Sequence, residues 1–356
     1  MADGKKIFGK QPEQEPPIGV LLVNFGMPER GSKKTVSEYL KTFLNDRRVS
    51  RRFEMILYRI LKREQFNAIV ERIAERCDEL ETEHAFDYHE TGARQKRMVA
   101  EELRRRGVEN VSVTMAYRYA TPTIHRALTH LSKIGCKQII VMPLYPQSSY
   151  AFTSSVSDVL RRERIRLPRG AEFRFIEGFH KNGAYIDAIA NNIRNTIDLE
   201  ENRPKIVFAF RAIPMRDVRK GDVYEIQTSA SALAIARKLG LERKEWTIAY
   251  IPYEHLGKHS LLAPDIYETV ERFHIAKIHD VAVVCPGKLT DSLETLYDID
   301  MVMREQFESF YEDEGDDYSF TYIPTLNDSP AFARLVAGIL YKNMTGWIER
   351  PTPPTV

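Results

Sequence analysis

Short apolar runs alternate with longer amphipathic stretches along most of the chain. The runs are four to eight residues long and rich in Val, Ile and aromatic residues, so they predict buried strands rather than helices. The stretches between them, such as 99–106, 123–134 and 229–239, predict helices. This alternation predicts an α/β fold with parallel sheets covered on both faces. The predicted strands are 18–25, 111–117, 138–144, 173–179, 206–210, 247–251, 281–284 and 320–323.

The predicted strands form two sets of four, and segments of one set correspond to segments of the other. The matching pairs are 111–117 with 247–250, 139–143 with 281–286, and 173–176 with 320–323. We therefore expect two similar Rossmann-like domains, each with a four-stranded parallel sheet. Ligands of such folds bind beyond the carboxyl ends of the strands, here in the cleft between the domains.

Domain boundaries follow from this pattern. The chain is divided into a disordered tail (1–17), an N-terminal α/β domain (18–180), a C-terminal α/β domain (181–330) and a C-terminal helix (331–348). The tail is polar and contains prolines. It has neither the apolar core of a secretory signal nor the arginines of a mitochondrial presequence.

Residues 36–61 fit neither repeat. They combine apolar positions with arginines and predict two amphipathic lip helices, broken near Asn45-Asp46. An apolar face rimmed by arginine could contact a membrane surface. The alternative, which we prefer, is that the segment packs over the first domain.

Composition excludes several classes of protein. A net charge of +2 gives no strong positive field for nucleic acid, and no apolar run is long enough to span a bilayer. Cys77, Cys136 and Cys285 are scattered and form no Cys-x-x-Cys motif. This argues against a disulfide framework or a cysteine metal cluster, and it fits a reducing intracellular compartment.

Six segments carry motifs that occur together in one known family. They are 18–28, 39–49, 118–124, 143–147, 291–296 and 322–330, and the fourth reads Pro-Leu-Tyr-Pro-Gln. With these motifs in this order, the chain resembles the ferrochelatases, which insert ferrous iron into a porphyrin. The resemblance implies a chelatase-like fold, a porphyrin cleft between the domains and a role in haem metabolism.

The departures from the family pattern fall where that family does its chemistry. Arg211 stands where the motif Ser-Phe-His-Gly-x-Pro has its histidine, which is the base at the metal site. Imidazole can bind a metal or accept a proton near neutral pH, whereas guanidinium can do neither. Other replaced family positions are the loop 85–88, Met27, Ser148, Ser154 and Leu261. We expect a divergent member with a degenerate metal site and little or no iron insertion.

The carboxylates of the 291–296 motif are candidate metal ligands. Asp291, Glu294 and Asp298 are spaced i, i+3 and i+7, so an α-helix would place them on one face. Carboxylate oxygens suit a hydrated divalent metal. The alternative is that Asp291 and Glu294 form a capping box, which needs no metal. The resemblance also implies that Arg211 faces Glu294 across the cleft, where the two would form an ion pair.

The resemblance supplies the remaining site residues. It places Arg118, Tyr119, Tyr145, Ser148 and Met27 around the porphyrin, with Arg118 as a cation for its propionates. The alternatives are a structural ion pair for Arg118 and a core position for Tyr145.

Four histidines are candidates for the missing chemistry: His84, His89 and His255 as replacement bases, and His255 with His259 as a metal-binding pair. His84 and His89 flank the altered loop, and His255 and His259 have the i, i+4 spacing of helical metal ligands. Gly257 between the latter two argues against a helix there.

Three functions remain open from the sequence. The first is a ferrochelatase-like protein that binds porphyrin or haem in a degenerate site. The second is an active ferrochelatase that uses another base, such as His255, with Fe2+ and porphyrin as substrates. The third is a non-catalytic partner that pairs with an active paralogue through 36–61. A homodimer is a further possible assembly. The resemblance implies a cytoplasmic or mitochondrial location, at times on a membrane. No permanent cofactor is expected, and the cysteines that bind an iron–sulfur cluster in some members are absent.

Overall fold

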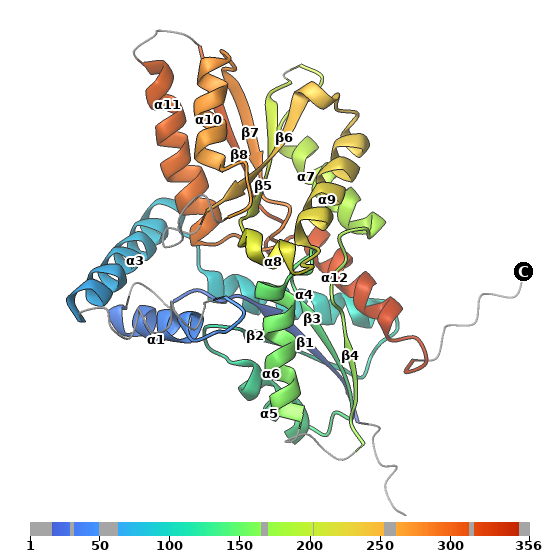
Figure 1. Cartoon of the computed structure of the whole chain (residues 1–356). Coiled ribbons are helices and arrows are strands. Elements are labelled where there is room, and N and C mark those ends of the chain that lie inside the picture. The colour runs from blue at the N-terminus through green and yellow to red at the C-terminus, as the bar shows by residue number, and fades with distance from the viewer. Residues whose placement is uncertain are drawn as a thin grey trace, which may run out of the picture.

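The computed structural model describes residues 16–28, 32–49, 63–164, 170–201, 203–252, 261–312 and 317–348. It contains two four-stranded parallel sheets, one above the other in Figure 1. The first has the order β2-β1-β3-β4 and the second β6-β5-β7-β8. The strands are β1 (Ile18–Asn24), β2 (Val111–Tyr117), β3 (Gln138–Pro143), β4 (Glu172–Phe175), β5 (Lys205–Arg211), β6 (Trp246–Ile251), β7 (Asp280–Val284) and β8 (Ser319–Ile323).

The predicted fold class is confirmed, and so is the internal duplication. The three pairs of similar segments are β2 with β6, β3 with β7, and β4 with β8, which hold equivalent places in the two sheets. All seven residues of β1 are buried, because helices cover both faces of its sheet.

The helices connect and cover the strands. They are α1 (Lys33–Leu44), α3 (Arg63–His84), α4 (Tyr88–Arg105), α5 (Ile124–Lys133), α6 (Ser155–Glu163), α7 (Gly183–Thr196), α8 (Met215–Arg219), α9 (Tyr224–Leu239), α10 (Ile266–Ile275), α11 (Arg304–Glu312) and α12 (Pro330–Asn343). The described residues also form two π-helical segments, η1 (Tyr150–Ser154) and η5 (Leu293–Met303), and a 3-10 turn, η3 (Arg243–Glu245).

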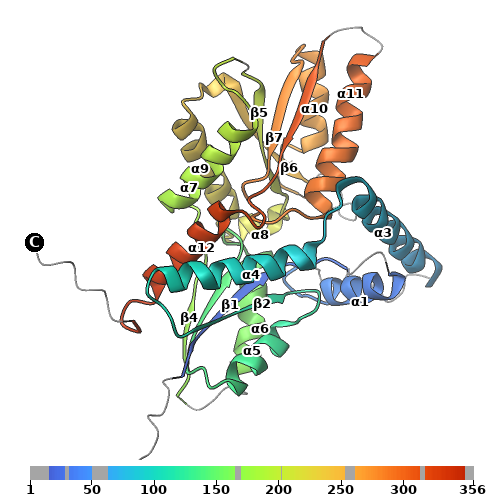
Figure 2. The same cartoon turned by 180° about the vertical axis from the view of Figure 1, so that it is seen from behind.

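Helices α1 and α3 lie side by side at one flank of the molecule (Figures 1 and 2). Val36 and Leu40 of α1 form a small core with Val70 and Ala74 of α3. The predicted break near Asn45 is confirmed, since α1 ends there. The second lip helix falls on 50–62, outside the described residues, so membrane contact by 36–61 stays a prediction. None of the described helices is long and apolar enough to cross a bilayer.

Helix α12 joins the two halves. It follows the second sheet in sequence but packs along α4 of the first half, as Figure 2 shows. Phe332, Val336 and Leu340 of α12 belong to the same buried cluster as Val20 of β1 and Leu103 of α4. The two halves therefore share one continuous core, and the domain boundaries at 180 and 330 stay a prediction.

Candidate functional site

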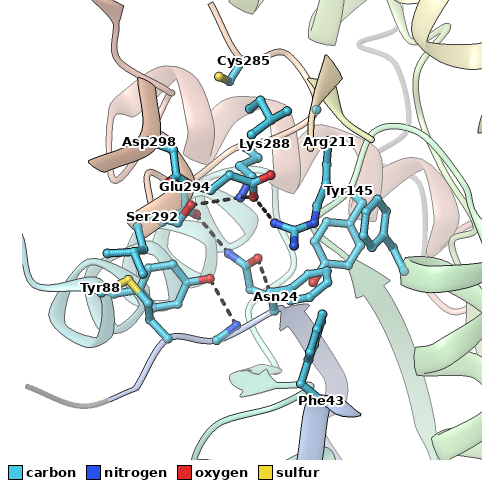
Figure 3. Close-up of a pocket in the computed structure, with 18 of the residues that line it drawn as sticks. Asn24, Phe43, Tyr88, Tyr145, Arg211, Cys285, Lys288, Ser292, Glu294 and Asp298 are labelled. Carbon is cyan, nitrogen blue, oxygen red and sulfur yellow. Dashed lines mark hydrogen bonds and ion pairs between the residues drawn. The ribbon is translucent and has the colours of Figure 1, made fainter. Parts of the chain in front are cut away.

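A pocket of about 1450 Å³, with its open mouth included, lies between the two sheets (Figure 3). It is built at the carboxyl ends of the strands. The segment after β1 contributes residues 24–28, β5 ends in Arg211, and the connection from β7 to η5 contributes residues 287–290. Helix α1 adds Tyr39 and Phe43 from the flank. The pocket occupies the place that the strand pattern predicted for a ligand.

The wall formed by the first half is aromatic. The ring of Phe25 lies 5.7 Å from that of Tyr145 and 5.3 Å from that of Phe152, measured between ring centroids. Tyr39 and Phe43 are stacked at 6.2 Å. Such a wall suits a large, flat, apolar ligand.

The opposite wall carries two cations bound to one carboxylate. Arg211 Nη1 lies 2.8 Å from Glu294 Oε2, so the expected ion pair is present, but both side chains belong to this one wall and do not face each other across the cleft. Lys288 Nζ forms a second, very close ion pair with the same oxygen and donates to Ser292 Oγ at 3.0 Å. All three side chains come from the second half and converge in Figure 3. Lys288 was not predicted from the sequence.

These two cations keep Glu294 ionised. Burial raises the pKa of the Glu294 carboxyl, but the positive charges of Arg211 and Lys288 outweigh burial and hold its pKa below the ordinary value. The other carboxylate oxygen, Oε1, is buried and accepts no hydrogen bond from the described residues. Two cations and one anion give the cluster a net charge of +1.

The face of three carboxylates predicted for a metal is not formed. Asp291 precedes η5, does not line the pocket, and accepts hydrogen bonds from Tyr322 Oη at 2.6 Å and Asn327 Nδ2 at 2.7 Å. Asp298 lines the pocket but lies 3.7 Å from Arg76. Among the described residues, no three His, Cys, Asp or Glu side chains are grouped so that they could hold a metal ion.

Two local features explain this error. The segment from Leu293 to Met303 is a π-helix, whose hydrogen bonds run from i to i+5, so the α-helical spacing rule does not apply. The capping box is formed by Ser292 and Thr295, one residue beyond the predicted pair.

Arg118 and Tyr119 lie behind the pocket wall. Arg118 Nη2 is 2.5 Å from Asp46 Oδ2, and its Nε donates to Ser155 Oγ at 2.6 Å. Tyr119 Oη donates to the same Asp46 oxygen at 2.9 Å. Neither residue lines the pocket. Arg118 therefore forms the structural ion pair that was the alternative to propionate binding.

Two of the other three predicted substrate-binding residues line the pocket, and one does not. Tyr145 and Met27 line the pocket, whereas Ser148 does not, and its backbone N–H donates to Gln227 Oε1 at 2.7 Å. The Tyr145 hydroxyl is buried and has no hydrogen-bond partner among the described residues.

The two candidate bases that the structure describes lie outside the pocket. His84 ends α3 with Nε2 3.9 Å from Asp300 Oδ2, and His89 Nε2 lies 3.1 Å from the Met27 carbonyl oxygen. Neither lines the pocket. His255 and His259 lie outside the described residues.

The unpartnered hydroxyl gives a stability prediction. We expect Tyr145→Phe to raise the free energy of unfolding by about 1 kcal/mol, because a buried hydroxyl without a partner destabilises the fold. Tyr322→Phe is the matched control, and it should lower that free energy by about 1–2 kcal/mol, since its hydroxyl donates to Asp291. Chemical denaturation measures both. An equal loss in the two variants would mean that Tyr145 has a partner.

Comparison with known proteins assigns the chain to a family. A family model described as Ferrochelatase matches residues 17–344. The ferrochelatase of Thioalkalivibrio sulfidiphilus is 33% identical over 332 residues, covering 93% of this chain and 88% of the relative. The ferrochelatase of Actinobacillus pleuropneumoniae is 34% identical over 315 residues, covering 87% and 93%.

A solved structure supports the fold. SirB from Bacillus subtilis with Fe3+ has a TM-score of 0.51 at 12% identity, covering 94% of this chain and 100% of that one. At this identity the likeness bears on the fold alone. The matched residues and the two ferrochelatase relatives show that this chain belongs to the ferrochelatase family.

Proposed function

We propose that this chain binds a tetrapyrrole in the pocket between its two sheets and inserts little or no iron into it. Family membership supports the ligand class, and so does a pocket with one aromatic wall. One observation supports the proposed loss of iron insertion: Glu294 forms ion pairs with both Arg211 and Lys288.

The chemistry of insertion explains why this cluster is inhibitory. When Fe2+ enters a free-base porphyrin, two pyrrole N–H protons leave, so the site needs a metal ligand and a proton acceptor. Arg211 can be neither, because its guanidinium stays protonated. Glu294 is ionised, but its Oε2 is already held by two cations. Their positive charges also repel an incoming divalent cation.

The second candidate function is an active ferrochelatase. It is favoured by relatives that carry this name and match more than nine-tenths of the chain. Such an enzyme would need another base. Among the described residues that line the pocket there is no histidine, so His255 is the candidate that the sequence offers.

A direct assay separates these functions. The purified protein is titrated with protoporphyrin, Fe2+ is added without oxygen, and the absorbance spectrum is followed. The Thioalkalivibrio sulfidiphilus ferrochelatase serves as the positive control. We expect porphyrin binding without haem formation. Haem formation at the rate of the control would overturn the proposal, and failure to bind any tetrapyrrole would leave a role as a non-catalytic partner.

A further inference from the structure

Arg211, Lys288 and Glu294 form a charged cluster on the pocket wall that the second half provides. In this cluster the two cations are partly exposed and the carboxylate is buried. The side chains of Arg211 and Lys288 are 23% and 24% exposed, whereas that of Glu294 is 8% exposed. The cations and the carboxylate all line one pocket, so a ligand that enters it meets positive charge first. A site built to receive a metal cation would present the carboxylate instead.

The other described residues that line the pocket do not cancel this charge. The charged residues that line it are Arg76, Arg211, Lys288, Glu294 and Asp298. Arg76 and Asp298 lie 3.7 Å apart and offset each other. Among the described lining residues, three cations and two anions leave a net charge of +1, and the opposite wall is apolar. Low local polarity strengthens the attraction of that charge for an anion.

The position of Lys288 is fixed before any ligand arrives. Its backbone N–H donates to the Cys285 carbonyl at 3.1 Å, which closes a turn after β7. A Cβ at Gly287 would lie 3.2 Å from the Phe210 ring, so the turn packs closely against β5. Glu294 and Ser292 then hold the ammonium group. A preorganised cation of this kind binds a carboxylate with little loss of side-chain entropy.

We infer that Lys288, together with Arg211, selects tetrapyrroles that carry free carboxylates and holds one carboxylate at this wall. The inference rests on the proposed function and adds the charge and the orientation of the ligand. Guanidinium and ammonium groups both form charge-assisted hydrogen bonds with carboxylates. Arg118, the cation expected from the sequence to do this, is held by Asp46 behind the pocket wall.

The test compares protoporphyrin with its dimethyl ester, which has the same ring and no carboxylates. Porphyrin absorbance and fluorescence give both dissociation constants at low salt. We expect the wild type to bind the free acid about tenfold more tightly than the ester, the usual effect of a charged hydrogen bond. Lys288→Met should remove most of this preference and leave ester binding within about twofold of wild type. Lys137→Met is the matched control, because Lys137 is exposed at the amino end of β3, away from the pocket.

A second variant tests whether added positive charge at the cluster strengthens binding of the free acid. Glu294→Gln raises the net charge of the cluster from +1 to +2, so we expect it to bind the free acid more tightly. A metal site would be weakened by the same change. If Glu294→Gln does not fold, Lys288→Met carries the test alone.

The outcomes separate the inference from the proposed function. Equal binding of acid and ester by the wild type, or a preference that survives Lys288→Met, would overturn the inference while tetrapyrrole binding stands. Failure to bind either compound would overturn both.

Discussion

The double variant Arg211→His, Lys288→Met is expected to insert Fe2+ into protoporphyrin at least about 100-fold faster than the unmodified chain. The first change supplies a side chain that can bind a metal and accept a proton near neutral pH. The second removes the remaining cation from Glu294 Oε2, since Lys288 forms its own ion pair with that oxygen. A positioned acid or base contributes about 10²–10⁴ to a rate, which sets the size of the expected gain.

Each single variant should gain much less than the pair. Arg211→His leaves Lys288 on the carboxylate, and Lys288→Met leaves a guanidinium in place of a base. The gains are therefore expected to be far from additive. Haem formation is measured at saturating porphyrin, because loss of Lys288 also weakens binding. Full activity in Arg211→His alone would mean that Lys288 does not obstruct the site.

Asp291→Ala is expected to lower the free energy of unfolding by about 3–5 kcal/mol. Asp291 is 2% exposed and accepts hydrogen bonds from Tyr322, Asn327, Thr295 and the backbone of Thr325. Removing the carboxylate leaves several of these donors buried without partners. Denaturation monitored by circular dichroism measures the loss.

Asp298→Ala is the control, since both aspartates were candidate metal ligands. The side chain of Asp298 is 27% exposed and its ion pair with Arg76 is long, so we expect a loss of about 1 kcal/mol or less. Similar small losses in both variants would show that Asp291 does not hold the start of η5.

The fold could be predicted from the sequence because the pattern of strands is local. Parallel strands buried on both faces appear as short apolar runs, and each of the eight predicted runs overlaps an observed strand. Helix α3 was not among the predicted helices. The packing of α12 on α4 depends on contacts between distant parts of the chain, which no local pattern encodes.

The candidate site could be predicted only in part. Arg211 and Glu294 were found because motifs of the family mark their positions. Lys288 was missed, although it carried a signal. β5 and β7 are neighbours in the sheet, so residues that follow them meet at one edge. Asp291 was misplaced because the spacing argument put it inside a helix, whereas the helix begins only after Ser292.

The shared helix α12 bears on how the chain is made. Its apolar side chains complete the core over β1 and α4, yet more than 200 residues separate α4 from α12. Nascent chains usually fold domain by domain from the amino end. Here the first half leaves the ribosome with part of its apolar surface uncovered and keeps it so until α12 has been synthesised. During translation this surface is open to chaperones and to aggregation, and the synthesis of α12 sets when that exposure ends.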